Sequence, residues 1–172
     1  MKRILTSFAA AVLFAFVANG QNVAFVNTEK ILSSIGQYTA AQNELSALSE
    51  KYKSVIETEI GKIDDLYQKY QSSKSSMNAS QRKFAEDEII AKEKVVKEKQ
   101  EIYFGENGIL AKKSEELLNP VKAKVDKAVK YIVEQEGGID MVVDLAAGQG
   151  VIYYNEKKDL TEKVIEICKL LN

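Results

Sequence analysis

The residue types that most often carry out catalysis are scarce in this chain. The sequence contains no histidine and a single cysteine, Cys168. Histidine is the commonest general base near neutral pH, and a nucleophilic cysteine needs a basic partner to become a thiolate. The sequence also has no G-x-S-x-G, Walker or dinucleotide-binding motif. We therefore expect no enzymatic activity, and a broad activity screen would test the opposite hypothesis.

The acidic residues offer little metal chemistry. Asp64–Asp65 and Glu115–Glu116 are adjacent pairs, and neighbours on a helix point about 100° apart, so they do not converge on one ion. The stretch 148–150 has two glycines, which is too short a signal for a phosphate-binding loop and is typical of a turn. We predict no metal site and no cofactor.

Cys168 lies among apolar residues near the end of the chain, next to Val164, Ile165, Ile167 and Leu171. This pattern favours a small buried side chain. An intermolecular disulfide is the alternative interpretation, because one cysteine cannot form an internal disulfide.

Residues 1–20 have the pattern of an export signal. Lys2 and Arg3 precede an apolar run from Ile4 to Val17, and small residues follow at positions 18–20. Such a run is short for a membrane span, so we predict cleavage before Gln21 and an exported protein; an uncleaved membrane anchor is the alternative. The processed chain carries 22 basic and 25 acidic residues. Without a basic excess, we expect no nucleic-acid partner.

The middle of the processed chain predicts two long helices. A short buried strand is expected at residues 22–27, and Asn27 or Thr28 can cap a short helix that ends at Ile35. One long helix is then expected from about Tyr38 to Ser76, roughly 55–60 Å long. Its apolar residues are spaced by three and four, which indicates a single stripe. These residues are Leu45, Leu48, Tyr52, Ile56, Ile60, Ile63, Tyr67 and Tyr70.

A second long helix is expected from about Gln81 to Gln135. Asn78 and Gln81 resemble a capping box, with Ser80 as an alternative cap. Two long amphipathic helices joined by a short link predict an antiparallel hairpin. Four residues inside these helices are expected to act as hinges: Gly61, Gly105, Gly108 and Pro120. Pro120 should kink or restart its helix, level with the start of the first helix, at a junction between arm and head.

The end of the chain changes to β-type periodicity. Residues 141–145 and 151–154 are predicted to form a hairpin, and a last helix to run from Asp159 to Leu171. The strands at the two chain ends are expected to meet in one small sheet. The predicted fold class is α+β, mainly α: a β-containing oligomerisation head (residues 21–37 plus 120–172) with a long coiled-coil hairpin inserted (residues 38–119).

This order of elements resembles the Skp/OmpH family of periplasmic chaperones. The resemblance covers nearly the whole processed chain, and its most specific parts are Val23 to Asn27, Ile139 to Asp144 and Asp159 to Ile165. It implies a jellyfish-like homotrimer whose arms hold unfolded outer-membrane proteins without ATP, near a membrane surface. One departure concerns charge: well-known members are strongly basic, whereas residues 38–135 carry 17 basic and 17 acidic residues. We therefore carry over no lipopolysaccharide site.

Apolar side chains are the remaining candidates for function. Ile56, Ile63 and Tyr67 are expected to pack one helix on the other. Soft side chains off this stripe or near the tip are the candidate client contacts: Tyr70, Met77, Phe84 and Phe104. A small head needs partner subunits to complete its burial, and its candidate oligomerisation residues are Val23, Phe25, Val142, Val143, Ile152 and Tyr153.

Two functional hypotheses remain open. A holdase chaperone, which protects unfolded proteins, should tolerate single changes near the hairpin tip and respond only when several apolar side chains are lost. A structural or adaptor coiled coil that docks one partner through its tip should be sensitive to single changes between Ser75 and Phe84.

Overall fold

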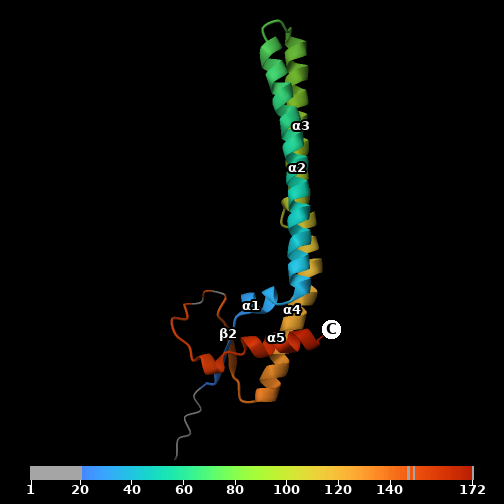
Figure 1. Cartoon of the computed structure of the whole chain (residues 1–172). Coiled ribbons are helices and arrows are strands. Elements are labelled where there is room, and N and C mark those ends of the chain that lie inside the picture. Colours follow the sequence, from blue (N-terminus) through green and yellow to red (C-terminus); the bar gives the residue numbers. More distant parts are fainter. Residues whose placement is uncertain (1–20, 147, 149, 172) are drawn as a thin grey trace, which may run out of the picture.

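The computed structural model describes residues 21–146, 148 and 150–171. Figure 1 shows a small head from which a long arm of helices, lying side by side, projects. The predicted signal peptide at residues 1–20 lies outside the described residues. None of the described helices is both long and apolar enough to span a bilayer.

Strands from the two ends of the chain meet in the head, as predicted. Strand β1 (Val23–Val26) pairs in parallel with β2 (Met141–Asp144), and Val23 lies opposite Met141. Two adjacent parallel strands need a long crossover, and here the whole arm is that crossover. Ala24 and Val26 are buried, whereas Val23 and Phe25, on the other face, are half-buried. The expectation that β1 is buried on both faces is therefore only half met.

The predicted hairpin between residues 141–145 and 151–154 is wrong. Residues 151–155 form no strand, and the other edge of β1 is occupied by an isolated bridge between Phe25 and Asp159. Gly148 and Gly150 have φ angles of 61° and 72°, so the turn between the two segments uses left-handed backbone suited to glycine. Val151 to Tyr154 add no strand beside β2, and the Tyr154 ring packs against Phe25 of β1 instead.

Local capping signals begin the helices where the sequence predicts. Asn27 caps α1 (Thr28–Ser33) by accepting a hydrogen bond from the Lys30 amide. Asn78 and Gln81 form a complete capping box at the start of α3 (Ala79–Phe104), with two reciprocal bonds of 2.9 Å. Between them, α2 (Gly36–Ser73) is one continuous helix of 38 residues, which corresponds to about 57 Å.

The second long helix is interrupted, so the predicted single helix from Gln81 to Gln135 is wrong. Helix α3 ends at Phe104, and α4 (Ile109–Glu136) begins after Gly108. A Cβ atom on Gly105 would overlap the Glu101 carbonyl oxygen, and one on Gly108 would lie 2.9 Å from two backbone oxygens. Glycine is therefore accommodated at both positions of the break, whereas a larger residue at either position would overlap backbone oxygen atoms.

The other two predicted hinges lie inside continuous helices. Gly61 lies within α2 and has open space around it. Helix α4 continues through Pro120, so the helix does not restart there, although Figure 1 shows its orange half leaning away from the line of its yellow half. Pro120 and Gln37 line one surface hollow, which places the proline level with the start of α2, as predicted. Whether these positions flex stays a prediction.

The core of the head lies between α4, α1 and the last helix, α5 (Thr161–Leu170). Ile31, Val121 and Val164 are its largest fully buried side chains. Cys168 is a free thiol that is only 3% exposed within this cluster, which confirms the interpretation of this residue as a small buried side chain.

The two kinds of glycine should respond oppositely to alanine. Gly105→Ala should lower the free energy of unfolding by about 1–3 kcal/mol, because the new methyl group overlaps a backbone oxygen. Gly61→Ala should raise it by about 1 kcal/mol, because alanine is the better residue in a helix interior. Urea unfolding of both variants checks this, and a Gly105→Ala protein as stable as the parent would contradict the tight fit at the break.

Candidate functional site

The two helices of the arm contact each other along a seam with the spacing of a coiled coil. On α2 the seam passes through Ile56, Glu59, Ile63, Leu66 and Tyr70, which alternate steps of three and four. An average step of 3.5 residues is the signature of a left-handed coiled coil. On α3, the buried residues Ile89 and Val96 are seven positions apart and belong to the same seam.

This seam differs from the predicted stripe at two positions. The prediction placed Ile60 and Tyr67 in the stripe, but their side chains are 40% and 53% exposed. Glu59 and Leu66 occupy the seam instead. The expectation that Tyr67 packs between the helices is therefore wrong, whereas Ile56 is buried and Ile63 half-buried. The predicted stripe and the seam share Ile56, Ile63 and Tyr70, and differ only in the residue between them. Residues three and four positions after Ile56 or Ile63 lie near the same helix face, and the seam takes the one three positions on.

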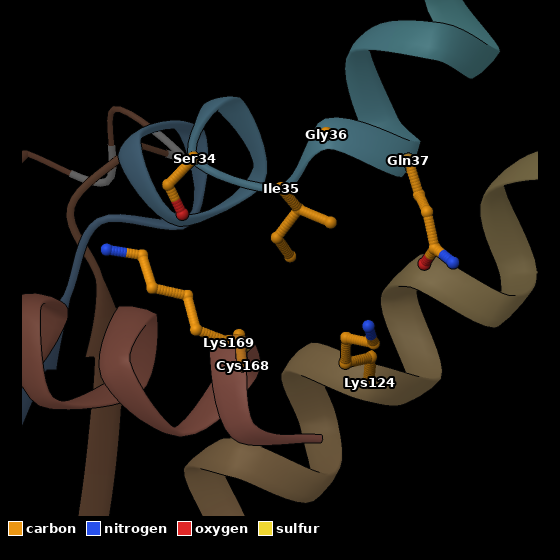
Figure 2. A pocket seen from close by; sticks show the side chains of 7 residues that line it. All are labelled: Ser34, Ile35, Gly36, Gln37, Lys124, Cys168 and Lys169. Atoms are coloured by element: carbon orange, nitrogen blue, oxygen red, sulfur yellow. The ribbon is translucent and has the colours of Figure 1, made fainter. Parts of the chain in front are cut away.

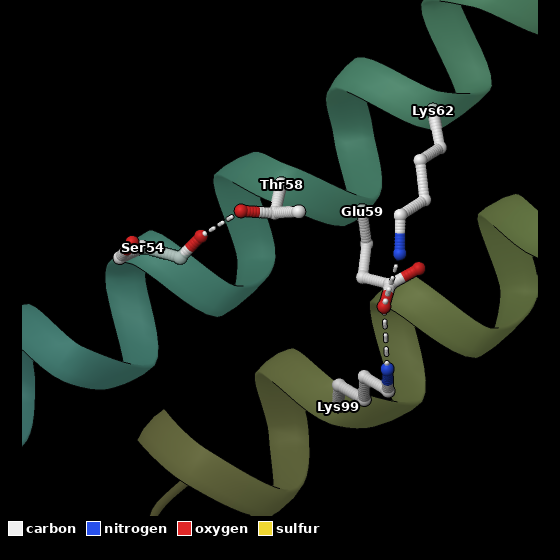
Figure 3. A network of polar contacts seen from close by, with 5 residues as sticks. All are labelled: Ser54, Thr58, Glu59, Lys62 and Lys99. Carbon is white, nitrogen blue, oxygen red and sulfur yellow. Dashed lines mark hydrogen bonds and ion pairs between the residues drawn. The ribbon is translucent and has the colours of Figure 1, made fainter.

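A charged network lies within the seam (Figure 3). Glu59 on α2 accepts a hydrogen bond of 3.2 Å from Lys99 on α3, and its carboxylate lies 3.4 Å from the Lys62 ammonium. The bond from Lys99 lowers the pKa of Glu59, and the charge of Lys62 adds to this effect. An ion pair between facing helices sets their register. No prediction from the sequence included this pair, although Glu59 lies between Ile56 and Ile63 at the spacing of a coiled coil.

An aromatic cluster lies beside the break between α3 and α4. The rings of Tyr52 and Tyr103 are stacked, with centroids 4.1 Å apart and planes within 9° of each other. Phe104 meets both rings edge-on, at 6.5 and 6.4 Å. The Tyr52–Tyr103 pair thus joins the unbroken helix to the last turn before the break.

Apolar side chains outside the seam are displayed along the arm. They lie on α2, on α3 and at the first residue of α4, are separated by charged and polar residues, and each remains at least 39% exposed. The set comprises Ile60, Tyr67, Phe84, Ile90, Val95, Ile102, Phe104 and Ile109. We call these eight residues the arm surface. Such scattered groups can make many weak contacts without a fixed geometry.

Three of the four predicted contact residues are accessible and one is not. Phe84 is 73% exposed and Phe104 40%; Met77 is half-buried and lines a tip hollow of about 510 Å³ together with Phe84. Tyr70 is only 5% exposed and donates a hydrogen bond to Glu86 across the hairpin. That bond raises the pKa of the Tyr70 hydroxyl. Tyr70 supports the hairpin instead of facing solvent, and the role of the other three stays a prediction.

The predicted oligomerisation residues differ widely in exposure. Val142 and Val143 are half-buried in β2, like Val23 and Phe25 in β1. Ile152 is completely exposed and Tyr153 is 87% exposed. Their neighbour Tyr154 turns inward: its ring packs 5.0 Å from Phe25 and its hydroxyl bonds Asp159. Among the described residues of one chain, the sheet face of Val23, Phe25 and Val143 is therefore only partly covered, and Ile152 and Tyr153 are exposed.

The hollow around Cys168 has little capacity for thiol chemistry. Figure 2 shows Cys168 with Lys124, Lys169 and residues 34–37 around a hollow of about 300 Å³ at the start of α2. Burial raises the pKa of the Cys168 thiol, and Lys124 offsets this only in part. A thiol with a raised pKa is a poor nucleophile at neutral pH. Among the described residues, no group of three acidic, cysteine or histidine side chains could hold a metal ion.

Comparison with known proteins gives one consistent family. The model of the OmpH family, described as outer membrane protein (OmpH-like), matches residues 22–167. The chaperone protein Skp of Photorhabdus luminescens is 24% identical over 98% of this chain and 100% of its own length. The chaperone protein Skp of Pectobacterium atrosepticum is 25% identical with the same coverage.

A solved structure supports the fold. An OmpH-like outer membrane chaperone of Caulobacter crescentus superposes with a TM-score of 0.65 at 13% sequence identity, covering 89% of this chain and 86% of the other. At that identity the likeness concerns the fold alone. It agrees with the predicted class, a mainly helical α+β chain with a long hairpin.

The charged seam predicts a defined pH dependence. The pKa of Glu59 is lowered in the folded protein, so the pair with Lys99 stabilises the fold above the ordinary glutamate pKa of 4.5 and loses this effect as the pH falls through the folded value. Glu59→Gln should therefore melt below the parent at neutral pH, and the gap should close on acidification. Melting followed by circular dichroism checks this, with exposed Glu57→Gln as the control. A gap that does not depend on pH would contradict the assignment.

Proposed function

Because the chain belongs to the OmpH-like family, which includes the Skp chaperones, we propose that it is an ATP-independent holdase. It binds unfolded outer-membrane β-barrel proteins in a cavity between helical arms and prevents their aggregation. It acts in the periplasm, near a membrane surface, after residues 1–20 are removed before Gln21. The proposal requires no catalysis, nucleotide or cofactor.

The observation that carries this proposal is the arm surface. A coiled-coil hairpin normally buries its apolar residues in the seam and covers its flanks with charge. Here eight apolar side chains, Phe84 the most exposed at 73%, lie outside the seam. Client proteins that share no sequence are best held by weak, dispersed contacts, because no single arrangement fits them all.

The balance of basic and acidic residues on the arm favours client binding through apolar contacts over binding through electrostatic attraction. Residues 38–135 carry 17 basic and 17 acidic residues. Several of these charges are paired along one helix, such as Lys53 with Glu50 and Lys83 with Asp87. Exposed pairs of this kind contribute little stability and keep the surface solvated. The charged groups therefore separate the apolar contacts along the arm, and client binding should depend only weakly on salt.

A cavity between arms requires several chains, and we propose that the head joins three of them. Residues 21–37 and 120–172 form this head, and residues 38–119 form the arm. Ile152 and Tyr153, which are 100% and 87% exposed, would be covered by a partner subunit, together with the half-buried sheet face of Val23, Phe25 and Val143. Val142 lies on the opposite face, against the core of the head, and its role in oligomerisation stays a prediction. A head of this size gains missing burial by oligomerisation. The number three comes from the family resemblance.

A second candidate function rests on the hairpin tip. Met77, Phe84 and Ala85 line a hollow of about 510 Å³ there, with Ser80 and Gln81. A hollow at the far end of a long arm could dock one specific partner, which would make the chain a structural or adaptor protein of the envelope. The two candidates differ in how they respond to single substitutions.

Client protection should fall only when several arm-surface residues are lost together. If each exposed side chain contributes about a third of its full burial energy, about 0.6 kcal/mol, one loss weakens client binding about threefold and four losses about sixtyfold. The measurement is light scattering from an aggregating, unfolded β-barrel protein mixed with each variant. The four-residue variant replaces the most exposed arm-surface residues by serine: Tyr67, Phe84, Ile90 and Ile102.

The matched control changes four exposed charged residues of the same helices to serine with no change in net charge: Lys51, Glu57, Glu88 and Lys97. This control should protect the client as well as the parent does. Loss of all protection in the single variant Phe84→Ser would favour the tip-docking function, and full protection by the four-residue apolar variant would overturn the holdase proposal.

A further inference from the structure

The interruption between α3 and α4 affects only one side of the arm. Four residues, 105–108, separate the two helices, whereas α2 passes the same level without a break. Across the break, the Gly108 amide bonds the Gly105 carbonyl at 2.9 Å, and regular bonding resumes with the Lys112 amide on the Gly108 carbonyl. The returning half of the hairpin therefore lacks a continuous hydrogen-bond ladder at this level alone.

A pair of helices bends most easily where one of them lacks this ladder. Gly61 lies inside the intact α2, and Pro120 lies inside the intact α4. At residues 105–108, the arm can bend when α2 alone curves, because the link between α3 and α4 can change its backbone angles. Among the four predicted hinges, the two glycines at the break are therefore the mechanical weak point.

The aromatic cluster is the contact that holds this weak point closed. Tyr103 and Phe104 are the last two residues of α3 before the break, and Tyr52 is on the unbroken helix. The stacked tyrosines, with ring centroids 4.1 Å apart, fasten the end of α3 to α2. Tyr52 and Tyr103 are both half-buried, so the rings can separate without exposing a deep core.

We propose that Tyr52, Tyr103 and Phe104 form a latch that holds the arm straight at the Gly105–Gly108 break, and that separation of the rings lets the outer arm pivot on α2. The outer arm is the part between Lys53 and Phe104 that carries the tip. The idea that the pivot lets the arm accommodate clients of different size rests on the proposed function. The pivot itself is expected in the protein without any client.

The test measures distances within one chain by spin labels. One label pair, at exposed Gln71 and Lys122, spans the break; a second, at exposed Glu57 and Gln71, spans Gly61 only. Cys168 stays in place because its burial and raised thiol pKa protect it from labelling. Labelled chains are refolded with an excess of unlabelled chains, so each assembly holds one pair and no client is present.

Loss of the stacked Tyr52–Tyr103 pair should broaden the Gln71–Lys122 distance distribution and leave the Glu57–Gln71 distribution unchanged. Tyr103→Leu keeps an apolar side chain at the site, and Tyr103→Ala removes it. Either should increase the bent population about two- to tenfold, the effect of losing one aromatic pair. The matched control is Tyr67→Leu, which changes an exposed tyrosine of the same arm.

Circular dichroism is used to check that each variant keeps the helix content of the parent. The latch is contradicted if both Tyr103 variants leave the Gln71–Lys122 distribution unchanged, if Tyr67→Leu broadens it equally, or if the Glu57–Gln71 distribution broadens as much. Because no client enters the measurement, failure of the latch and failure of the holdase proposal are separate results.

Discussion

The need to cover one side of a very long helix shapes this molecule. Helix α2 has 38 residues, about 57 Å, which is far more than the small head can bury. Its apolar seam is instead covered by the chain folding back on itself, with the Asn78–Gln81 capping box starting the return at the tip. The seam occupies only a narrow stripe of each helix, because a coiled coil places about two residues in seven between its helices. The remaining apolar residues are left outside the seam, and the proposed binding of unfolded proteins rests on their exposure.

The same constraint divides the chain into regions with different tasks. In the head, β1 and β2 come from opposite ends of the sequence, so closing the sheet fixes the base of the arm. Ile152 and Tyr153 are left for a partner subunit in the proposed assembly. In the arm, the Glu59–Lys99 pair joins α2 and α3 within the seam, and the proposed pivot lies at the break at residues 105–108. The scarcity of catalytic side chains agrees with a function that depends on surface and shape.

Much of this fold could be predicted from local signals in the sequence. The capping residues Asn27 and Asn78, the meeting of the end strands and the burial of Cys168 are confirmed, because each depends on a few neighbouring residues or on a strong apolar pattern. Finer features were missed where the outcome depends on the position of the partner helix. Residues three and four positions after Ile63 lie near the same helix face, and only the placement of α3 puts Leu66, and not Tyr67, in the seam. The predicted strand at residues 151–154 was wrong because β propensity does not specify a pairing partner, and one chain supplies none there.

The mass of the processed protein in solution tests the central claim most directly, because a client cavity can exist only if several heads join. Multi-angle light scattering should give three times the chain mass for the parent and for Leu170→Asp, which places a charge on another side chain with high exposure (76%) in the head. Ile152→Asp should shift the mass toward that of a single chain, since it buries a charge against the partner subunit. A parent protein that remains a single chain at every concentration would contradict the account.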